Sequence, residues 1–89
     1  MSMGARIWVI DDDAASRELL ARVLAARGWL VTPLADGREA LERLAAEGPP
    51  DLVVSDIRMA EVGGLEVTEV FRRDAPDTPV ILVTAFGNV

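Results

Sequence analysis

The sequence has no cysteine, no histidine and no lysine among its 89 residues. Without cysteine the chain can form neither a disulfide bond nor a thiolate metal site. Without histidine it lacks the most common metal ligand and the side chain most often used as a general base. Any chemistry that this chain performs must therefore use carboxylates, hydroxyls, arginines or a bound metal ion.

Long apolar runs and clustered positive charge are missing too. No apolar run approaches the ~20 residues that a membrane-spanning helix needs, and the start lacks the basic and apolar regions of a signal peptide. The net charge is −6, and all nine basic residues are arginine. Because contacts to nucleic-acid phosphates need clustered positive charge, direct nucleic-acid binding is not expected. We expect a cytoplasmic protein without membrane contact.

The composition is that of a small globular domain. Apolar residues make up 51% and charged residues 27% of the sequence, which supplies enough apolar material for a core and argues against disorder. A chain of this length buries little more than ~60% of the surface that its unfolded form exposes. We expect one domain at residues 6–89, preceded by a short leader at residues 1–5.

Four short apolar runs alternate with stretches of helical periodicity. Pro33 cannot donate a hydrogen bond to a neighbouring strand, so the second run is expected at an edge of the sheet. Asp36 and Glu39 have the spacing of a capping box, and Gly28 suits the position just after a helix. One apolar stripe marks the first helix: Leu19, Leu20, Val23 and Leu24. The expected strands are residues 6–10, 30–34, 52–55 and 79–83, and the expected helices are residues 14–27, 37–47 and 65–73.

This order, βαβαβαβ, predicts an α/β fold. Strands joined by helical crossovers pair in parallel, and right-handed crossovers place helices on both faces, which gives a doubly wound parallel sheet. The ligand sites of such sheets lie at the carboxyl ends of the strands, near the point where the strand order reverses. The residues that follow each strand are therefore the candidates for function.

Acidic and hydroxyl side chains stand at three of these strand ends. Asp11, Asp12 and Asp13 follow the first strand, Asp56 follows the third and Thr84 follows the fourth. If these strands are neighbours, the side chains converge on one patch. Close carboxylates repel one another, and an all-oxygen cluster suits Mg²⁺, which takes one or two carboxylates and keeps several waters. A magnesium site of this kind indicates phosphoryl transfer.

Each of these residues alone has a plainer interpretation. Asp13 is explained equally well as a helix N-cap, because carboxylates favour helix N-termini. Three acids in a row can form a solvated turn, and Asp56 or Thr84 alone would be an ordinary turn or strand residue. Their joint occurrence at three strand ends of one sheet favours a functional site.

At these residues the sequence resembles a known family. Residues 8–13 (WVIDDD), 55–59 (SDIRM) and 83–85 (VTA) resemble the receiver domains of bacterial two-component response regulators, and the similarity runs over residues 6–89. Residues 55–59 and 84–89 are similar to receivers of the nitrogen-regulator type. Those receivers precede an ATPase domain and a DNA-binding domain in enhancer-binding transcription activators. The resemblance implies a flavodoxin-like fold.

The resemblance also implies a role for each matching residue. Asp56 matches the phosphoacceptor. Asp11 and Asp12 match the acidic pair that holds Mg²⁺, Asp12 directly and Asp11 largely through water. Asp56 itself and the backbone carbonyl of Arg58 match further metal ligands. Thr84 matches the hydroxyl residue that turns toward the phosphoryl group.

The implied function is a signalling switch rather than a metabolic enzyme. A sensor histidine kinase supplies the phosphoryl group, Mg²⁺ assists its transfer to Asp56, and the receiver promotes its own phosphorylation and dephosphorylation. Phosphorylation then acts on an output. The resemblance implies that this output is transcription activation by the ATPase and DNA-binding domains of the full-length protein.

The sequence departs from the family pattern at several positions. Ala60 stands where the family usually has proline, and Gly63 where it often has aspartate, whereas Gly64 matches the loop glycine. The last strand and helices of the family fold are missing, and with them the lysine that pairs with the phosphoryl group; arginine is a poor substitute for it. Strand 80–83 is then expected to form an open apolar edge. Two alternatives follow: the chain is a fragment of a longer one, or it forms a homodimer through this strand.

Two other functions are compatible with the same topology. One is a phosphorylation-independent interaction or dimerisation module with a degenerate receiver fold, and the presence of Asp11, Asp12, Asp56 and Thr84 together speaks against it. The other is a flavodoxin-like binder of a nucleotide or flavin. No glycine-rich phosphate loop follows the first strand, which disfavours that binder.

Overall fold

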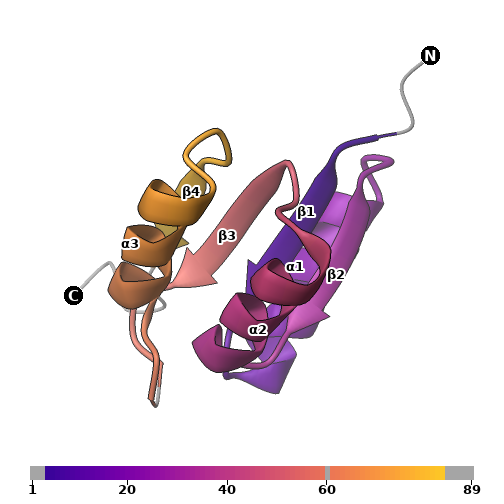
Figure 1. The fold of residues 1–89 in the computed structure, drawn as a ribbon. Coiled ribbons are helices and arrows are strands. Elements are labelled where there is room, and N and C mark those ends of the chain that lie inside the picture. The colour runs from indigo at the N-terminus through magenta and orange to yellow at the C-terminus, as the bar shows by residue number, and fades with distance from the viewer. Residues whose placement is uncertain (1–3, 60, 84–89) are drawn as a thin grey trace.

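Four parallel strands form the centre of the structure, a computed structural model that describes residues 4–59 and 61–83 (Figure 1). Helices connect consecutive strands, so the predicted βαβαβαβ order and α/β fold are confirmed. The strands are β1 (Arg6–Ile10), β2 (Leu30–Leu34), β3 (Leu52–Asp56) and β4 (Val80–Val83), and the helices are α1 (Ala14–Ala25), α2 (Gly37–Glu47) and α3 (Gly64–Asp74).

The strand order is β2-β1-β3-β4, and every pairing is parallel. Pro33 lies on the edge strand β2, opposite Val9, as its missing N–H predicts. The chain runs outward from β1 to β2 and then returns to the other side of β1 to form β3. The carboxyl ends of β1 and β3 therefore lie side by side at the point where the strand order reverses, which is where ligand sites form in such sheets.

The two faces of the sheet are covered unequally. On one face, α2 and α3 pack over a cluster of eight buried residues that includes Trp8, Val53 and Phe71. On the other face, α1 packs over three buried residues, Ile7, Val9 and Val54. Alternate residues of β1 thus enter opposite clusters, which explains why this strand is an unbroken apolar run. Figure 1 shows α2 and α3 on the viewer's side of the sheet.

The three helices are short, and aspartates cap the first two. The Asp13 carboxylate accepts a hydrogen bond from the Ser16 N–H at 2.8 Å, and the Asp36 carboxylate accepts one from the Glu39 N–H at 2.8 Å. The Glu39 carboxylate reaches back to the Ala35 N–H at 3.1 Å, close to the predicted capping box. Among residues 4–59 and 61–83, no helix has the length and apolar character needed to cross a bilayer.

Several predicted boundaries were wrong by one or two residues. Helix α1 ends at Ala25 rather than at residue 27, and Gly28 follows a short turn with φ of +90° instead of standing directly after the helix. Strand β3 includes Asp56, α3 spans Gly64–Asp74, and β4 starts one residue later than predicted. Ala5, placed in the predicted leader, accepts a hydrogen bond from the Leu30 N–H at 2.9 Å.

The apolar stripe of α1 is buried only in part. Leu20 and Leu24 pack against the core, whereas Leu19 is 63% and Val23 is 49% exposed. Helix α1 lies over β1 and β2, so the part of its stripe that points toward β3 and β4 meets no described helix. The periodicity predicted the helix correctly, but it did not show how much of the stripe the sheet would cover.

Candidate functional site

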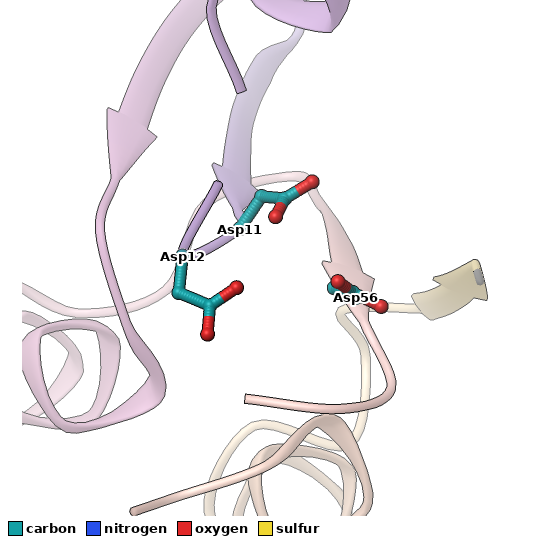
Figure 2. Close-up of side chains that lie close together, drawn as sticks. All are labelled: Asp11, Asp12 and Asp56. Carbon is teal, nitrogen blue, oxygen red and sulfur yellow. The ribbon is translucent and has the colours of Figure 1, made fainter. Parts of the chain in front are cut away.

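Three carboxylates meet where β1 and β3 end. Asp11 and Asp12 lie in the turn after β1, and Asp56 is the last residue of β3. The parallel pairing of Ile10 with Ser55 brings these ends together. One carboxylate oxygen from each of the three aspartates lies within 4.8 Å of the other two. Figure 2 shows the three side chains around one space between the strand ends, so the convergence predicted from the sequence is confirmed for these residues.

The cluster carries an electrostatic cost that a cation would relieve. Burial raises the pKa of the Asp11 carboxyl, and the neighbouring charges of Asp56, Asp12 and Asp13 raise it further, while a hydrogen bond from the Asp13 N–H acts in the opposite direction. Like charges at such distances disfavour ionisation. The donors are all carboxylate oxygens, half-buried at Asp11 and Asp56 and exposed at Asp12. This donor set fits Mg²⁺, which prefers oxygen ligands and retains water.

Hydrogen bonds fix the turn that carries Asp11 and Asp12. The Asp13 N–H donates to Asp11 Oδ1 at 2.9 Å, and Arg17 Nη1 donates to the Asp11 carbonyl oxygen at 2.8 Å. Asp13 itself points away as the cap of α1, and its hydrogen bonds to Ser16 lower its pKa. The structure thus gives Asp13 the capping role that was one of its two interpretations, and Asp13 is absent from the cluster of Asp11, Asp12 and Asp56.

The backbone around Asp56 is closely packed. The Ser55 hydroxyl is buried and donates to the Asp56 carbonyl oxygen at 2.9 Å. Helix α3 begins so near this carbonyl that a β-carbon at Gly64 would overlap the oxygen, which explains a glycine there. The Arg58 N–H donates a long hydrogen bond of 3.4 Å to Asp56 Oδ1. The ligand role of the Arg58 carbonyl stays a prediction.

Thr84, the predicted switch residue, lies outside the described residues. Its predecessor Val83 pairs with Asp56 in the sheet, and the Val83 carbonyl oxygen accepts a hydrogen bond from the Ile57 N–H at 3.0 Å. Ala60, the departure from the family pattern in the loop after Asp56, also lies outside them. The role of Thr84 therefore stays a prediction.

Sequence reasoning missed two residues of this site, Arg17 and Ser55. Arg17 stands four positions after Asp13, a spacing that places oppositely charged side chains near each other on a helix, and this could have drawn attention to it. Ser55 lies within an apolar run, where only its polarity distinguishes it. Neither residue carried a pattern that predicts contact with the backbone of the acidic residues.

A groove of about 320 Å³ opens beside the carboxylates. Its polar lining residues are Asp11, Ser16 and Asp56. Its other walls are mainly apolar side chains of α1 and β4: Leu19, Leu20, Val23 and Val83. The acidic cluster is therefore accessible from a surface with apolar character, next to the exposed part of the α1 stripe.

Comparison with known proteins agrees with this geometry. A family model described as the response regulator receiver domain matches residues 7–89. The chain is 44% identical over 87 residues to the response regulator MprA of Mycolicibacterium vanbaalenii, covering 98% of this chain and 37% of that protein. It is 40% identical over 83 residues to the DNA-binding transcriptional regulator NtrC of Escherichia coli, covering 93% of this chain and 18% of that protein.

Solved structures show the same architecture. The response regulator TrrA of Thermotoga maritima, crystallised in complex with Mg²⁺-BeF, superposes with a TM-score of 0.85 at 39% identity, covering 92% of this chain and 70% of that one. NtrX of Brucella abortus, crystallised with ATP, gives a TM-score of 0.80 at 30% identity, covering 97% of this chain and 19% of that one. The predicted flavodoxin-like sheet is thus confirmed, and the chain belongs to the receiver domain family of two-component response regulators.

Proposed function

We propose that Asp56 is the phosphoacceptor of this receiver and that Mg²⁺ binds beside it. Asp11, Asp12, Asp56 and the backbone carbonyl of Arg58 would hold the ion. The observation that carries the proposal is the convergence of carboxylate oxygens from the turn after β1 and the end of β3 within 4.8 Å. Such a cluster is costly without a cation, and it lies where parallel sheets gather their ligands.

The chemistry follows from the residue types. A carboxylate oxygen of Asp56 attacks the phosphorus of a phosphohistidine or a small acyl phosphate; a P–O bond forms and the bond to the leaving group breaks. The leaving nitrogen or oxygen keeps the electron pair and takes up a proton from solvent when it needs one. Bound Mg²⁺ supplies neutralisation of the charge that develops on the phosphoryl oxygens. Asp11 and Asp12 keep their carboxylates directed at this space.

The partners follow from the family. A receiver domain implies a sensor histidine kinase as phosphodonor. The chain spans 37% of MprA and 18% of NtrC. For the full-length protein we propose a cytoplasmic transcription activator with an ATPase domain and a DNA-binding domain, in which the DNA-binding domain, and not the receiver, contacts the DNA. The phosphoryl group adds nearly two negative charges. Thr84, following β4, would respond to that charge and pass the change to the output.

Asp56→Asn should abolish phosphorylation. The chain is incubated with acetyl phosphate and Mg²⁺, and the mass increase of one phosphoryl group is followed by mass spectrometry. Asp77→Asn, an exposed aspartate away from the cluster, serves as the matched control and should be labelled like the unchanged chain. Labelling of the Asp56→Asn variant, or no labelling of the unchanged chain, contradicts the proposal.

A second candidate function is self-association, and the exposed apolar face favours it. On β4, Ile81 is 48% and Val83 is 37% exposed, and Val83 lines the groove together with the exposed Leu19 and Val23 of α1. Patches of this kind mark interaction surfaces, and a strand at a sheet edge can pair with another chain. The partner in this proposal is a second copy of the chain. Because each copy carries a net charge of −6, salt should strengthen the association.

Light scattering on the 89-residue chain should reveal a dimer that Ile81→Lys converts to a monomer. Ile81 is already half-exposed, so the substitution should leave the fold intact. Leu65→Lys, at an exposed leucine of α3, is the matched control and should remain dimeric. A dilute, stable monomer of the unchanged chain would rule out this function without affecting the phosphoacceptor proposal.

A further inference from the structure

Arg17 of helix α1 donates a hydrogen bond to the turn that carries Asp11 and Asp12. We propose that Arg17 is a positioning residue that holds the turn carrying Asp11 and Asp12 in the geometry that binds Mg²⁺. The proposal rests on the proposed function, because it concerns the same metal site. Arg17 Nη1 donates to the Asp11 carbonyl oxygen at 2.8 Å, and the Arg17 side chain is half-buried.

The Asp11 carbonyl needs such a donor because it lies beyond the sheet. Ile10 is the last residue of β1 that pairs with β2 or β3. The Asp11 N–H still reaches the Leu34 carbonyl oxygen at 3.2 Å, but the chain then turns away toward α1. A carbonyl at this point can rotate, and its rotation would move the carboxylates on either side. The hydrogen bond from Arg17, which belongs to helix α1, restricts this rotation.

Three hydrogen bonds connect the turn to the start of α1. The Asp13 N–H binds Asp11 Oδ1 at 2.9 Å, the Ser16 N–H binds Asp13 Oδ2 at 2.8 Å, and Arg17 returns to the Asp11 carbonyl. Two of these bonds engage Asp11, one at its carbonyl oxygen and one at Oδ1. One carboxylate oxygen each from Asp11 and Asp12 lies within 4.8 Å of an Asp56 carboxylate oxygen, and Figure 2 shows the three carboxylates around one space.

The direction in which removal of Arg17 changes the Mg²⁺ affinity distinguishes a positioning role from a purely electrostatic one. If Arg17 acted only through its positive charge, it would repel Mg²⁺, and its removal would strengthen metal binding. If it acts by orienting the turn, its removal weakens binding, as the loss of partners that orient metal ligands typically does by about 10–100-fold. The two explanations therefore predict changes in opposite directions.

The test measures the Mg²⁺ affinity of the full chain by following amide chemical shifts during titration with MgCl₂. Arg17→Met should weaken binding by about tenfold, and Arg17→Lys, which restores a charged donor, should recover part of the loss. Arg22→Met, on the exposed side of the same helix, removes the same charge and should change the affinity by less than about twofold. At saturating Mg²⁺ the labelling rate with acetyl phosphate should return to that of the unchanged chain.

The same spectra report whether each variant is folded, so a loss of stability is separated from a loss of metal binding. Unchanged or tighter Mg²⁺ binding by folded Arg17→Met overturns the proposal while leaving the phosphoacceptor function standing. An Arg17→Lys variant as weak as Arg17→Met also counts against it. If the unchanged chain binds no Mg²⁺, the metal site and this positioning role fall together.

Discussion

Phe71→Ala should lower the free energy of unfolding by about 3–5 kcal/mol. Phe71 is 1% exposed and lies on the inner side of α3. Its ring packs edge-to-face on Trp8 of β1, with centroids 6.1 Å apart and an angle of 88° between the planes. Removing the ring leaves a cavity between helix and sheet and loses this aromatic pair.

The expected loss is large for a chain of this size. At about 0.05–0.15 kcal/mol per residue, 89 residues correspond to roughly 4–13 kcal/mol in total. Urea denaturation followed by tryptophan fluorescence measures the difference, because Trp8 is buried against Phe71. Leu65→Ala, at an exposed position of the same helix, should cost less than about 0.5 kcal/mol. Equal losses at the two positions would mean that the packing described for α3 is wrong.

Asp12→Asn should act on stability and function in opposite directions. Without metal, the substitution removes one of the repelling charges of the cluster and should raise the midpoint of thermal unfolding. With Mg²⁺, the unchanged chain gains stability by mass action, about 2.7 kcal/mol at one hundred times the dissociation constant. The variant should lose most of this gain. Because a metal ion contributes several kcal/mol to phosphoryl transfer, labelling by acetyl phosphate should slow by about a hundredfold or more.

Asp13→Asn is the matched control for Asp12→Asn. It removes the same charge from the neighbouring residue, whose carboxylate caps α1 instead of joining the cluster. Asparagine caps helices almost as well as aspartate, so its stability should change little and its response to Mg²⁺ should persist. Thermal unfolding with and without MgCl₂ distinguishes the two. A full Mg²⁺ response in Asp12→Asn, or its loss in Asp13→Asn, would reverse the assignment of roles.

The position of the acidic cluster could be predicted because it depends on few, regular features. An unbroken apolar run identifies a strand covered on both faces, and β1 has that environment. Pro33 identified an edge strand, and the crossover order implied parallel pairing. Once β1 and β3 are neighbours, residues that follow them must meet, so Asp11, Asp12 and Asp56 converge whatever the details of the loops.

Other features depend on three-dimensional contacts that a local pattern does not contain. The exposure of Leu19 and Val23 depends on how far α1 extends over the sheet, which their helical spacing does not determine. The overlap that requires a glycine at position 64 arises from the approach of α3 to the Asp56 carbonyl. The contact of Arg17 with the Asp11 carbonyl depends on the angle between the turn and α1. Each is a property of the assembled structure.

The acidic cluster combines Asp11 and Asp12, which lie in one turn, with Asp56, which is distant in the sequence. This difference has a consequence for folding. Apart from the bond of the Asp11 N–H to Leu34, the hydrogen bonds of the Asp11 turn join residues no more than six positions apart. Asp56 joins them only through the pairing of β1 with β3, after two crossover helices. Local contacts form faster than distant ones because they close shorter loops. Half of the cluster can therefore form while the chain is still largely unfolded, and the appearance of a complete Mg²⁺ site would mark the docking of β3.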